Sequence, residues 1–146
     1  MQLVAITDDA GMVVEAGWLA RAEGVHRQLR PQLPADYPEK MGRVFAGGGR
    51  MLVAIDAAAV VGVALYRIYQ DTFNGIKFYI DDLVTDEQCR SRGVGHAMVE
   101  WLAAAARNAG CSGLSLDSGT QRTQAHRFYF REGFVIPSFH FNRSLK

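Results

Sequence analysis

The sequence predicts a single α/β domain, in which helices pack on a mixed, largely antiparallel sheet. Three strand-like apolar runs follow one another between residues 51 and 85, and two stretches with helical period come later, at 93–109 and 123–132. The chain has 146 residues, the usual size of one domain. Its hydrophobic fraction of 49% is ordinary for a globular protein that buries a core without disulfides or metals. Residues 1–146 are therefore expected to form one domain.

Composition excludes several classes of function. The formal net charge is +1, which predicts no nucleic-acid partner and no membrane surface. The N-terminus lacks the basic and apolar regions of a signal peptide, and no apolar run reaches the ~20 residues of a membrane helix. Cys89 and Cys111 are too few for a disulfide framework and are expected to stay reduced. We therefore expect a cytoplasmic protein.

The first fifty residues predict a strand and two helices. Residues 2–6 alternate weakly, as in a short strand. Residues 9–29 have helical spacing that is broken by Gly17 and Gly24. A loop with three prolines follows, because proline cannot continue a helix. A short helix is then expected near 38–46, ended by three glycines.

Three antiparallel strands are expected next. Residues 51–55 and 60–69 are apolar, partly β-branched runs on either side of a four-residue break, which is a hairpin signal. Asn74-Gly75 is a dipeptide favoured in tight hairpin turns. Residues 76–85 then form the third strand of the row.

Helices and strands alternate in the last third of the chain. Residues 93–109 have an apolar stripe at helical spacing, with Gly110 placed as a C-terminal cap. Residues 114–117 alternate as a short strand, and the helix before them allows a parallel crossover.

A second late helix is expected over 123–132. Thr120 or Thr123 would cap its start, and Gly133 would end it. The alternation of two phenylalanines with polar residues over 139–142 then predicts a last strand.

The turn at residues 90–96 is the most informative segment. It follows a strand and opens a helix, whose first N–H groups lack partners and favour an anion. Gly93 and Gly95 let the backbone approach a phosphate, and Arg90 and Arg92 add charged donors. Met98 stands where a dinucleotide-binding motif needs its third glycine, and no Gly-Lys-Ser/Thr of a P-loop is present. A glycine turn without a ligand is the alternative.

Two motifs in this region carry a resemblance to a known family. Asp82-Leu83-Val84-Thr85 followed by Arg90-x-x-Gly93-x-Gly95 resembles the acyl-CoA signature of the GNAT superfamily of N-acetyltransferases. The run 125–134, with its aromatic-Tyr pair and Gly-Phe end, resembles the second signature. The resemblance covers residues 50–146 well and the first 50 in outline. It implies a GNAT-like mixed, mostly antiparallel central sheet with helices on both faces.

The resemblance also implies where acetyl-CoA binds. Backbone amides of residues 91–96 would hold the pyrophosphate, and the pantetheine arm would pair with residues 83–85, between that strand and 114–117. Arg122 replaces an asparagine frequent in the family, and would contact the cofactor phosphates or an anionic substrate. The expected cofactor-binding residues are Leu83, Val84, Thr85, Arg90, Ser91, Arg92, Gly93, Val94, Gly95, His96 and Arg122.

The transfer needs a proton acceptor for the amine and a proton donor for the thiolate. Asp81 and Asp82 lie on the strand beside the expected thioester, and strict alternation would point them to opposite faces. Asp82 is the preferred general base; the alternative is that both carboxylates are exposed or hold loops together. Tyr129 matches the general-acid tyrosine of the family and stays protonated at neutral pH. The alternative for Tyr129 is a packed core aromatic.

The four histidines show no metal-ligand spacing, so no metal is expected. His96 is assigned to the phosphate turn, His126 to a structural or solvated position, and His140 to the acceptor cleft.

The predicted function is acetyl transfer from acetyl-CoA to the primary amine of a small molecule, by direct attack. The tail is similar to bacterial members related to aminoalkylphosphonate N-acetyltransferases, which implies an amine carrying an anion. A polyamine, an aminoglycoside, an amino acid and a protein N-terminus stay open as acceptors. The alternatives are a non-catalytic acyl-CoA-binding regulatory module, an acetyltransferase of protein amines and a generic nucleotide-binding domain. The oligomeric state is open between monomer and homodimer.

Overall fold

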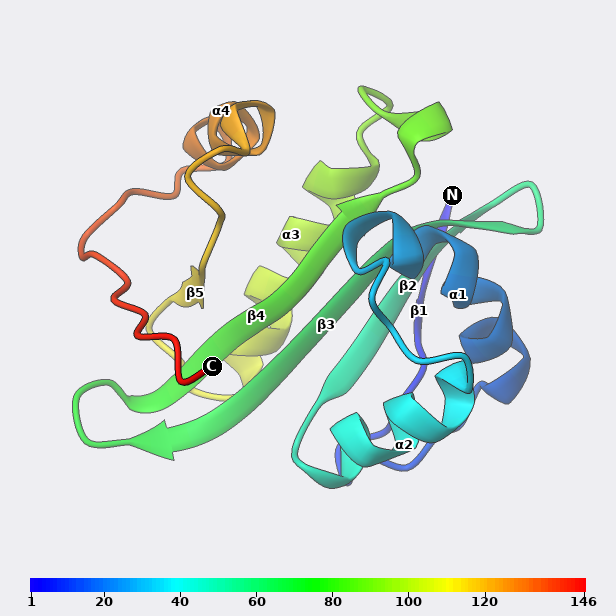
Figure 1. Ribbon diagram of the computed structural model, residues 1–146, viewed down its shortest axis with the longest axis horizontal. Helices are drawn as coiled ribbons and strands as arrows, with labels where there is room; N and C mark the ends of the chain where they lie inside the picture. Colours follow the sequence, from blue (N-terminus) through cyan, green and yellow to red (C-terminus); the bar gives the residue numbers. More distant parts are fainter. The chain divides into compact units, whose positions relative to one another are not determined.

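The computed structural model describes all 146 residues, and they divide into two compact units, Met1–Ser115 and Leu116–Lys146. The elements, in chain order, are β1 (Gln2–Ala5), α1 (Ala16–Leu29), α2 (Tyr37–Ala46), β2 (Arg50–Asp56), β3 (Ala59–Asp71), β4 (Gly75–Thr85), the 3₁₀ turn η1 (Glu87–Cys89), α3 (Val94–Asn108), β5 (Leu114–Leu116) and α4 (Thr123–Arg131) (Figure 1). None of the helices is long and apolar enough to cross a bilayer.

The strands form one sheet in the order β1-β2-β3-β4-β5. The pairs β1–β2, β2–β3 and β3–β4 are antiparallel, as the runs of apolar residues predict. The hairpin of β3 and β4 is the longest, and its register runs from Gly62 opposite Thr85 to Asp71 opposite Gly75. A mixed α/β fold with a largely antiparallel sheet is confirmed.

Two tight turns join the three long strands. Ala57 and Ala58 connect β2 to β3 with φ of 48° and 63°, the left-handed conformation that two-residue hairpin loops need and that asparagine and glycine usually supply. At the other end, the Asp71 carboxylate accepts hydrogen bonds from the backbone N of Asn74 at 2.6 Å and from its Nδ2 at 2.7 Å. Gly75 follows with φ of 86°, so the turn predicted at Asn74-Gly75 is confirmed.

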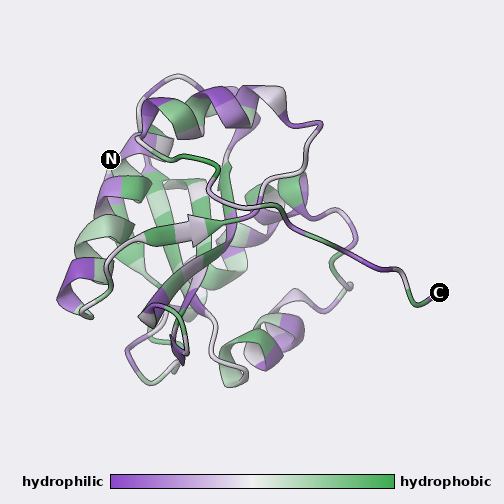
Figure 2. Ribbon diagram, turned by 90° about the vertical axis from the view of Figure 1, so that its left-hand side faces the viewer, coloured by the Kyte–Doolittle hydropathy of each residue, from purple (hydrophilic) through white to green (hydrophobic).

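Helices α1 and α2 pack against one face of the sheet, and α3 packs against the other (Figure 1). The strands are hydrophobic and the helices combine hydrophobic and hydrophilic residues (Figure 2). The buried core between α1, α2 and the sheet consists of Ile6, Leu19, Ala22, Val25, Tyr37, Met41, Phe45, Met51, Val53, Ile55, Val60, Val63 and Leu65. Helices therefore cover both faces, as the resemblance implies.

The α3 face depends on a glycine in the middle of β3. A Cβ built on Gly62 would lie 2.7 Å from Met98 Cε and 3.0 Å from Val94 Cγ1, so any larger residue would force the Met98 side chain of α3 to move. Further along the same face, the rings of Tyr66 and Phe78 stack at 4.9 Å. These contacts place the first turn of α3 directly over the strands that carry the candidate site.

The first helix begins later than the sequence predicts. Residues 9–15 are not helical, because Thr7 bridges to Val13 and the Asp8 carboxylate accepts from the backbone N of Ala10 and Met12. Helix α1 then continues through both of its glycines. Helix α2 begins as expected, and the Asp36 carboxylate caps it by accepting from the backbone N of Glu39 at 3.1 Å.

The second unit holds α4 and the tail. The predicted threonine cap of α4 is wrong: Arg122 is the N-cap residue, Thr123 is the first helical residue, and no side chain caps the start. The strand predicted over 139–142 is also absent. Phe139 and Phe141 are 85% and 91% exposed, so the alternation has no buried face to fix a strand.

Candidate functional site

A β-bulge in β4 shapes the candidate site. Leu65 of β3 pairs with Asp82, and the next residue, Tyr66, pairs with Ile80, so Asp81 is an extra residue in β4. Ile80 shares the α3 face with Tyr66, whereas Asp82 shares the α1 face with Leu65. The bulge thus reverses which side of the sheet the following residues face.

Both aspartates meet cations on the face covered by α1 and α2. Asp82 is bound by Arg30, the C-cap residue of α1, and the Asp81 carboxylate accepts from Arg67 Nε at 2.8 Å. Arg67 also donates from Nη1 to the carbonyl of Gly47, at the end of α2. The prediction that the two carboxylates point to opposite faces is wrong, because strict alternation does not hold across a bulge.

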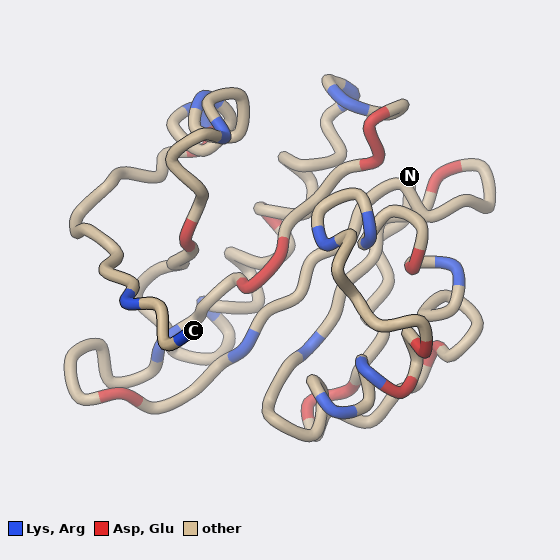
Figure 3. The backbone as a smooth tube through the Cα atoms, in the orientation of Figure 1, with Lys and Arg blue, Asp and Glu red and all other residues tan.

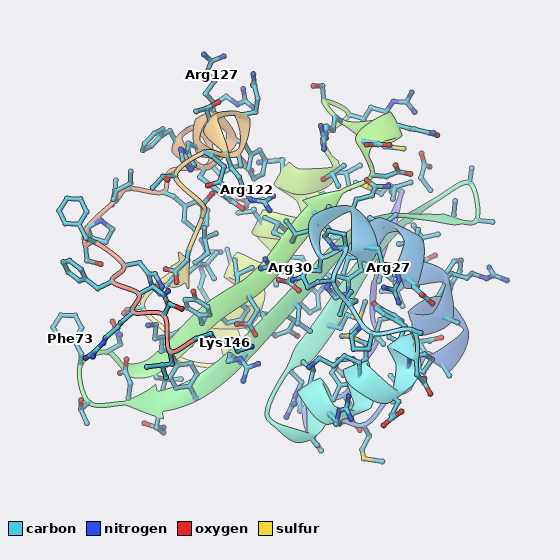
Figure 4. All side chains as sticks on the ribbon, viewed as in Figure 1. Arg27, Arg30, Phe73, Arg122, Arg127 and Lys146 are labelled. Carbon is cyan, nitrogen blue, oxygen red and sulfur yellow. The ribbon has the colours of Figure 1, made fainter.

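Asp82 is the centre of a buried hydrogen-bond network that joins α1, α2 and β4. Its side chain is 9% exposed, and its Oδ2 accepts from His26 Nε2 at 2.7 Å. Its Oδ1 accepts from Arg30 Nε at 2.8 Å and forms an ion pair with Arg30, whose Nη2 lies 2.7 Å away. The other ring nitrogen of His26, Nδ1, lies 2.8 Å from the hydroxyl of Tyr37. Figure 4 shows Arg30 extending from the end of α1 over the strands.

The chemistry of the network assigns its protons. Burial alone would raise the pKa of Asp82, but the hydrogen bonds and charges of His26 and Arg30 outweigh it and hold that pKa below its usual value. An ionised carboxylate only accepts, so His26 Nε2 carries a proton. Burial, with the nearby charges of Glu23 and Asp82, raises the pKa of Tyr37, which therefore keeps its hydroxyl proton beside His26 Nδ1. Both ring nitrogens of His26 therefore have a hydrogen-bond partner.

Sequence reasoning missed His26, Arg30 and Tyr37. The signal that could have found the first two is their spacing of four, at the last turn of α1 and its C-cap, which continues the core-facing stripe of Leu19 and Ala22. A histidine and an arginine on a core-facing stripe need a buried acceptor, and Asp82 is the one acidic residue in the buried set.

A cavity of about 370 Å³ lies beside this network, between the end of α1, helix α2 and the sheet. Its charged and polar lining comes from the α1–α2 region and β4, and its apolar lining from the loop, α2 and β3. The lining residues are His26, Arg30, Gln32, Leu33, Pro34, Lys40, Met41, Val44, Leu65 and Asp82. Figure 3 shows acidic residues of the sheet close to basic residues of the helical layer.

The turn between β4 and α3 has the geometry of an anion site. Ser91 and Gly93 are left-handed, with φ of 63° and 82°, and Gly93 is the N-cap residue of α3. The first helical bond runs from Ala97 N to the carbonyl of Gly93, so the amides of residues 94–96 precede the helical ladder. Arg90 and Arg92 are exposed. Backbone N–H groups at the start of a helix suit a phosphate.

The predicted pantetheine segment is the end of β4. Leu83, Val84 and Thr85 pair with β3 through one edge of the strand. The neighbour on the other edge, β5, has three residues against eleven in β4, so most of that edge has no ladder partner. The contact of these three residues with an acyl-CoA stays a prediction.

Tyr129 lies on α4 in the second unit, packed between two phenylalanines. Its ring meets those of Phe128 and Phe134, each at 5.5 Å between centroids. Gly133 ends the helix with φ of 87°, and its N donates to the carbonyl of Phe130 while Phe134 N donates to that of Tyr129. These paired bonds are the Schellman motif, so the predicted stop at Gly133 is confirmed.

The environment of Tyr129 favours the protonated phenol. Burial raises the pKa of Tyr129, and the charge of Arg122 opposes that rise. The ring packing matches the core-aromatic alternative, and the retained proton is what a general acid needs. The catalytic role of Tyr129 and the ligand of Arg122 stay predictions.

The remaining histidines have local partners. His126 Nε2 contacts the carbonyl of Gly119 at 2.8 Å, which fits the structural position expected for it. His140 Nδ1 lies 3.1 Å from an oxygen of Asp117 within the second unit. The assignment of His96 to the phosphate turn stays a prediction.

Comparisons with known proteins identify the family of the chain. Residues 20–134 match the Acetyltransferase (GNAT) family. The uncharacterized N-acetyltransferase YhdJ of Bacillus subtilis is 44% identical over 70 residues, which are 47% of this chain and 49% of that protein. The aminoalkylphosphonate N-acetyltransferase of Salmonella typhimurium is 35% identical over 66 residues, which are 45% of this chain and 43% of that protein. The match thus spans about half the length of each curated relative.

A solved structure has the same fold. The aminoglycoside N-acetyltransferase AAC(6')-Iy in complex with CoA superposes with a TM-score of 0.82 at 18% identity, over 99% of this chain and 95% of that chain.

Proposed function

Because the chain belongs to the GNAT family of acetyltransferases, we propose that it transfers an acetyl group from acetyl-CoA to the primary amine of a small molecule. The observation that carries the proposal is the turn of residues 90–96, which lies between η1 and α3 and presents backbone N–H groups at the start of α3. The diphosphate of acetyl-CoA would bind there, with the pantetheine arm along residues 83–85.

The amine must lose a proton before it attacks. An alkyl amine with a pKa of about 10.4 is neutral in about one molecule in 10³ at pH 7, so its deprotonation costs about 4–5 kcal/mol. We propose that Asp82 receives this proton through a water and passes it on to solvent. Because the pKa of Asp82 is lowered, the carboxylate is ionised before the amine arrives and would hold the proton only briefly.

Direct attack then forms a tetrahedral intermediate that expels the thiolate of coenzyme A. Tyr129 would donate its phenolic proton to the sulfur as the C–S bond breaks. Its raised pKa means that the donor form is fully populated at neutral pH, while the thiol it generates has an ordinary pKa of about 8.5.

The test is the release of thiol from acetyl-CoA with a broad panel of primary amines, alongside calorimetric titration of coenzyme A, ATP and NAD. We expect thiol release with at least one amine. Among the three titrated ligands, we expect binding of coenzyme A but not of ATP or NAD. If coenzyme A binds but no amine releases thiol, the non-catalytic acyl-CoA-binding module is favoured. If thiol is released only with peptides, the acceptor is a protein amine. If ATP or NAD competes equally well, the chain is a generic nucleotide-binding domain.

A homodimer is a further part of the proposal. Several large apolar side chains of the second unit are exposed, namely Phe130, Val135, Ile136, Phe139, Phe141 and Leu145, and such groups support association. Light scattering after size exclusion measures the mass, and a monomer at all concentrations would contradict this part.

A further inference from the structure

We infer that the cavity beside Asp82 is the acceptor pocket and that Lys40 selects amines that carry an acidic group. This inference rests on the proposed acetyl transfer and names the class of its acceptor. The cavity lies on the face of the sheet where the bulge directs Asp82, and Asp82 is the residue before the segment proposed to hold the pantetheine arm. An amine in the cavity would therefore lie next to the thioester.

The charges around the cavity leave one cation uncompensated. Arg30 and Asp82 form an ion pair, and both ring nitrogens of His26 are engaged by Asp82 and Tyr37. Lys40, the remaining charged lining residue, makes no ion pair. An uncompensated cation in a pocket attracts an anionic ligand.

The acidic residues near Lys40 on α2 are used elsewhere. The Glu39 carboxylate is bound by Arg43 at 3.2 Å, one turn along the helix. The Asp36 carboxylate caps the helix through the backbone N of Glu39. The charge of Lys40 is therefore available to a ligand.

Arg30 can supply a second contact to the same anion. Its hydrogen bonds run from Nε and Nη2 to Asp82 and to the carbonyl of Asp81, so the N–H groups of Nη1 point to no protein acceptor. A carboxylate, phosphonate or sulfonate would accept from both cations through charge-assisted hydrogen bonds.

The rest of the lining suits a short carbon chain. Leu33, Pro34, Met41, Val44 and Leu65 give the cavity an apolar wall. Its volume of about 370 Å³ lies at the small end of the roughly 300–1,000 Å³ range of ligand sites. The acceptor is thus a compact aminoalkyl acid, with its amine toward Asp82 and its acid toward Lys40.

The experiment compares matched acceptors and variants. The probes are β-alanine, taurine and 2-aminoethylphosphonate, against ethylamine and ethanolamine, which lack the acid. Lys40→Met keeps the aliphatic stem and removes the charge, and Lys40→Arg keeps the charge. Arg43→Met removes a cation from the same helix outside the cavity, as a matched control. Thermal melts check that each variant is folded.

We expect the wild-type protein to have a higher kcat/KM for at least one acidic amine than for the neutral ones. Lys40→Met should lower that preference by about 10- to 100-fold, as expected for losing one charge-assisted hydrogen bond. Lys40→Arg should keep most of the preference for acidic amines, and Arg43→Met should keep all of it. An equal effect of Lys40→Met on acidic and neutral amines, or a wild-type preference for neutral ones, would overturn the inference and leave the acetyl transfer standing.

A binding measurement separates this inference from the proposed function. If no amine releases thiol, acetyl transfer fails, and calorimetry with coenzyme A bound then tests the pocket alone. At least tenfold weaker binding of an acidic amine to Lys40→Met than to the wild-type protein would support the anion site. No binding of any acidic amine to the wild-type protein would refute it.

Discussion

Replacing Asp82 by asparagine tests whether the buried network holds the two helices on the sheet. Asparagine has nearly the same shape, so the change removes the charge and one acceptor without opening a cavity. Its amide oxygen can accept from His26 or Arg30, and its NH₂ group then faces the other donor. The network should lose one contact entirely and keep a weakened second one.

The structure gives the magnitude of this loss. The contact with His26 is buried, at 1% and 9% exposure of the two side chains, and a hydrogen bond to a buried charge contributes about 1.5–3 kcal/mol. The pair with Arg30 counts for less, because the Arg30 side chain is 38% exposed and an exposed pair contributes up to about 1 kcal/mol. We expect Asp82→Asn to lower the free energy of unfolding by about 3 kcal/mol. For a chain of this size, that lowers Tm by roughly 6–12 °C.

Urea denaturation of both proteins as a function of pH measures the effect. The folded-state pKa of Asp82 lies below its ordinary value, so its contribution is complete above about pH 4 and is lost as the pH falls through the folded-state pKa. The difference between the two proteins should therefore be constant near pH 7 and shrink in acid. Equal stability at pH 7, or a difference that grows in acid, would refute the assignment of an ionised, hydrogen-bonded Asp82.

Three further predictions concern other parts of the chain. Tyr129→Phe should lower kcat by about 10²- to 10⁴-fold and change coenzyme A affinity little, because the ring stays and the donated proton is lost; since burial raises the pKa of Tyr129, wild-type turnover should not fall from phenol ionisation below about pH 10. Gly24→Ala should raise the free energy of unfolding by about 1 kcal/mol in urea, because a Cβ at this position in α1 meets nothing within 4 Å. Gly62→Val should lower it by about 2–3 kcal/mol, because the new side chain overlaps Met98.

Each of these has a control and a contrary result. For Tyr129→Phe, unchanged kcat would remove the tyrosine from the mechanism. For Gly24→Ala, the same substitution at Gly110, where φ is 82°, should destabilise, and a gain at both positions would contradict the backbone argument. For Gly62→Val, adding Met98→Ala should recover part of the loss, and independent, additive losses would show that the two residues are not in conflict.

Period and turn chemistry were enough to predict most of the fold. The hairpins at residues 56–59 and 74–75, and α3 with its glycine stop, follow from local signals that agree with the tertiary structure. The prediction fails where a local hydrogen bond competes with the helix, or where a strand has no surface to pack against. Asp8 captures two backbone amides and delays α1, and the alternation over 139–142 has no buried face to enforce it.

The candidate site was predictable only in part. The phosphate turn and Tyr129 lie in contiguous motifs, which sequence spacing can identify. The network of His26, Tyr37 and Asp82 joins residues 11 and 56 positions apart, so no local pattern shows it. The side of the sheet to which Asp82 points depends on a single extra residue in β4. An insertion of one residue leaves no signature in hydrophobic spacing.

The stop of α4 also fixes the ring proposed to donate the proton. Gly133 turns the chain back, so that the backbone N of Phe134 donates to the carbonyl of Tyr129. The same turn brings the ring of Phe134 against the ring of Tyr129. The turn that ends α4 therefore also packs a ring against Tyr129. A substitution at Phe134 would remove this ring contact while every proposed site residue stayed unchanged, so a survey of variants restricted to those residues would miss its effect on Tyr129.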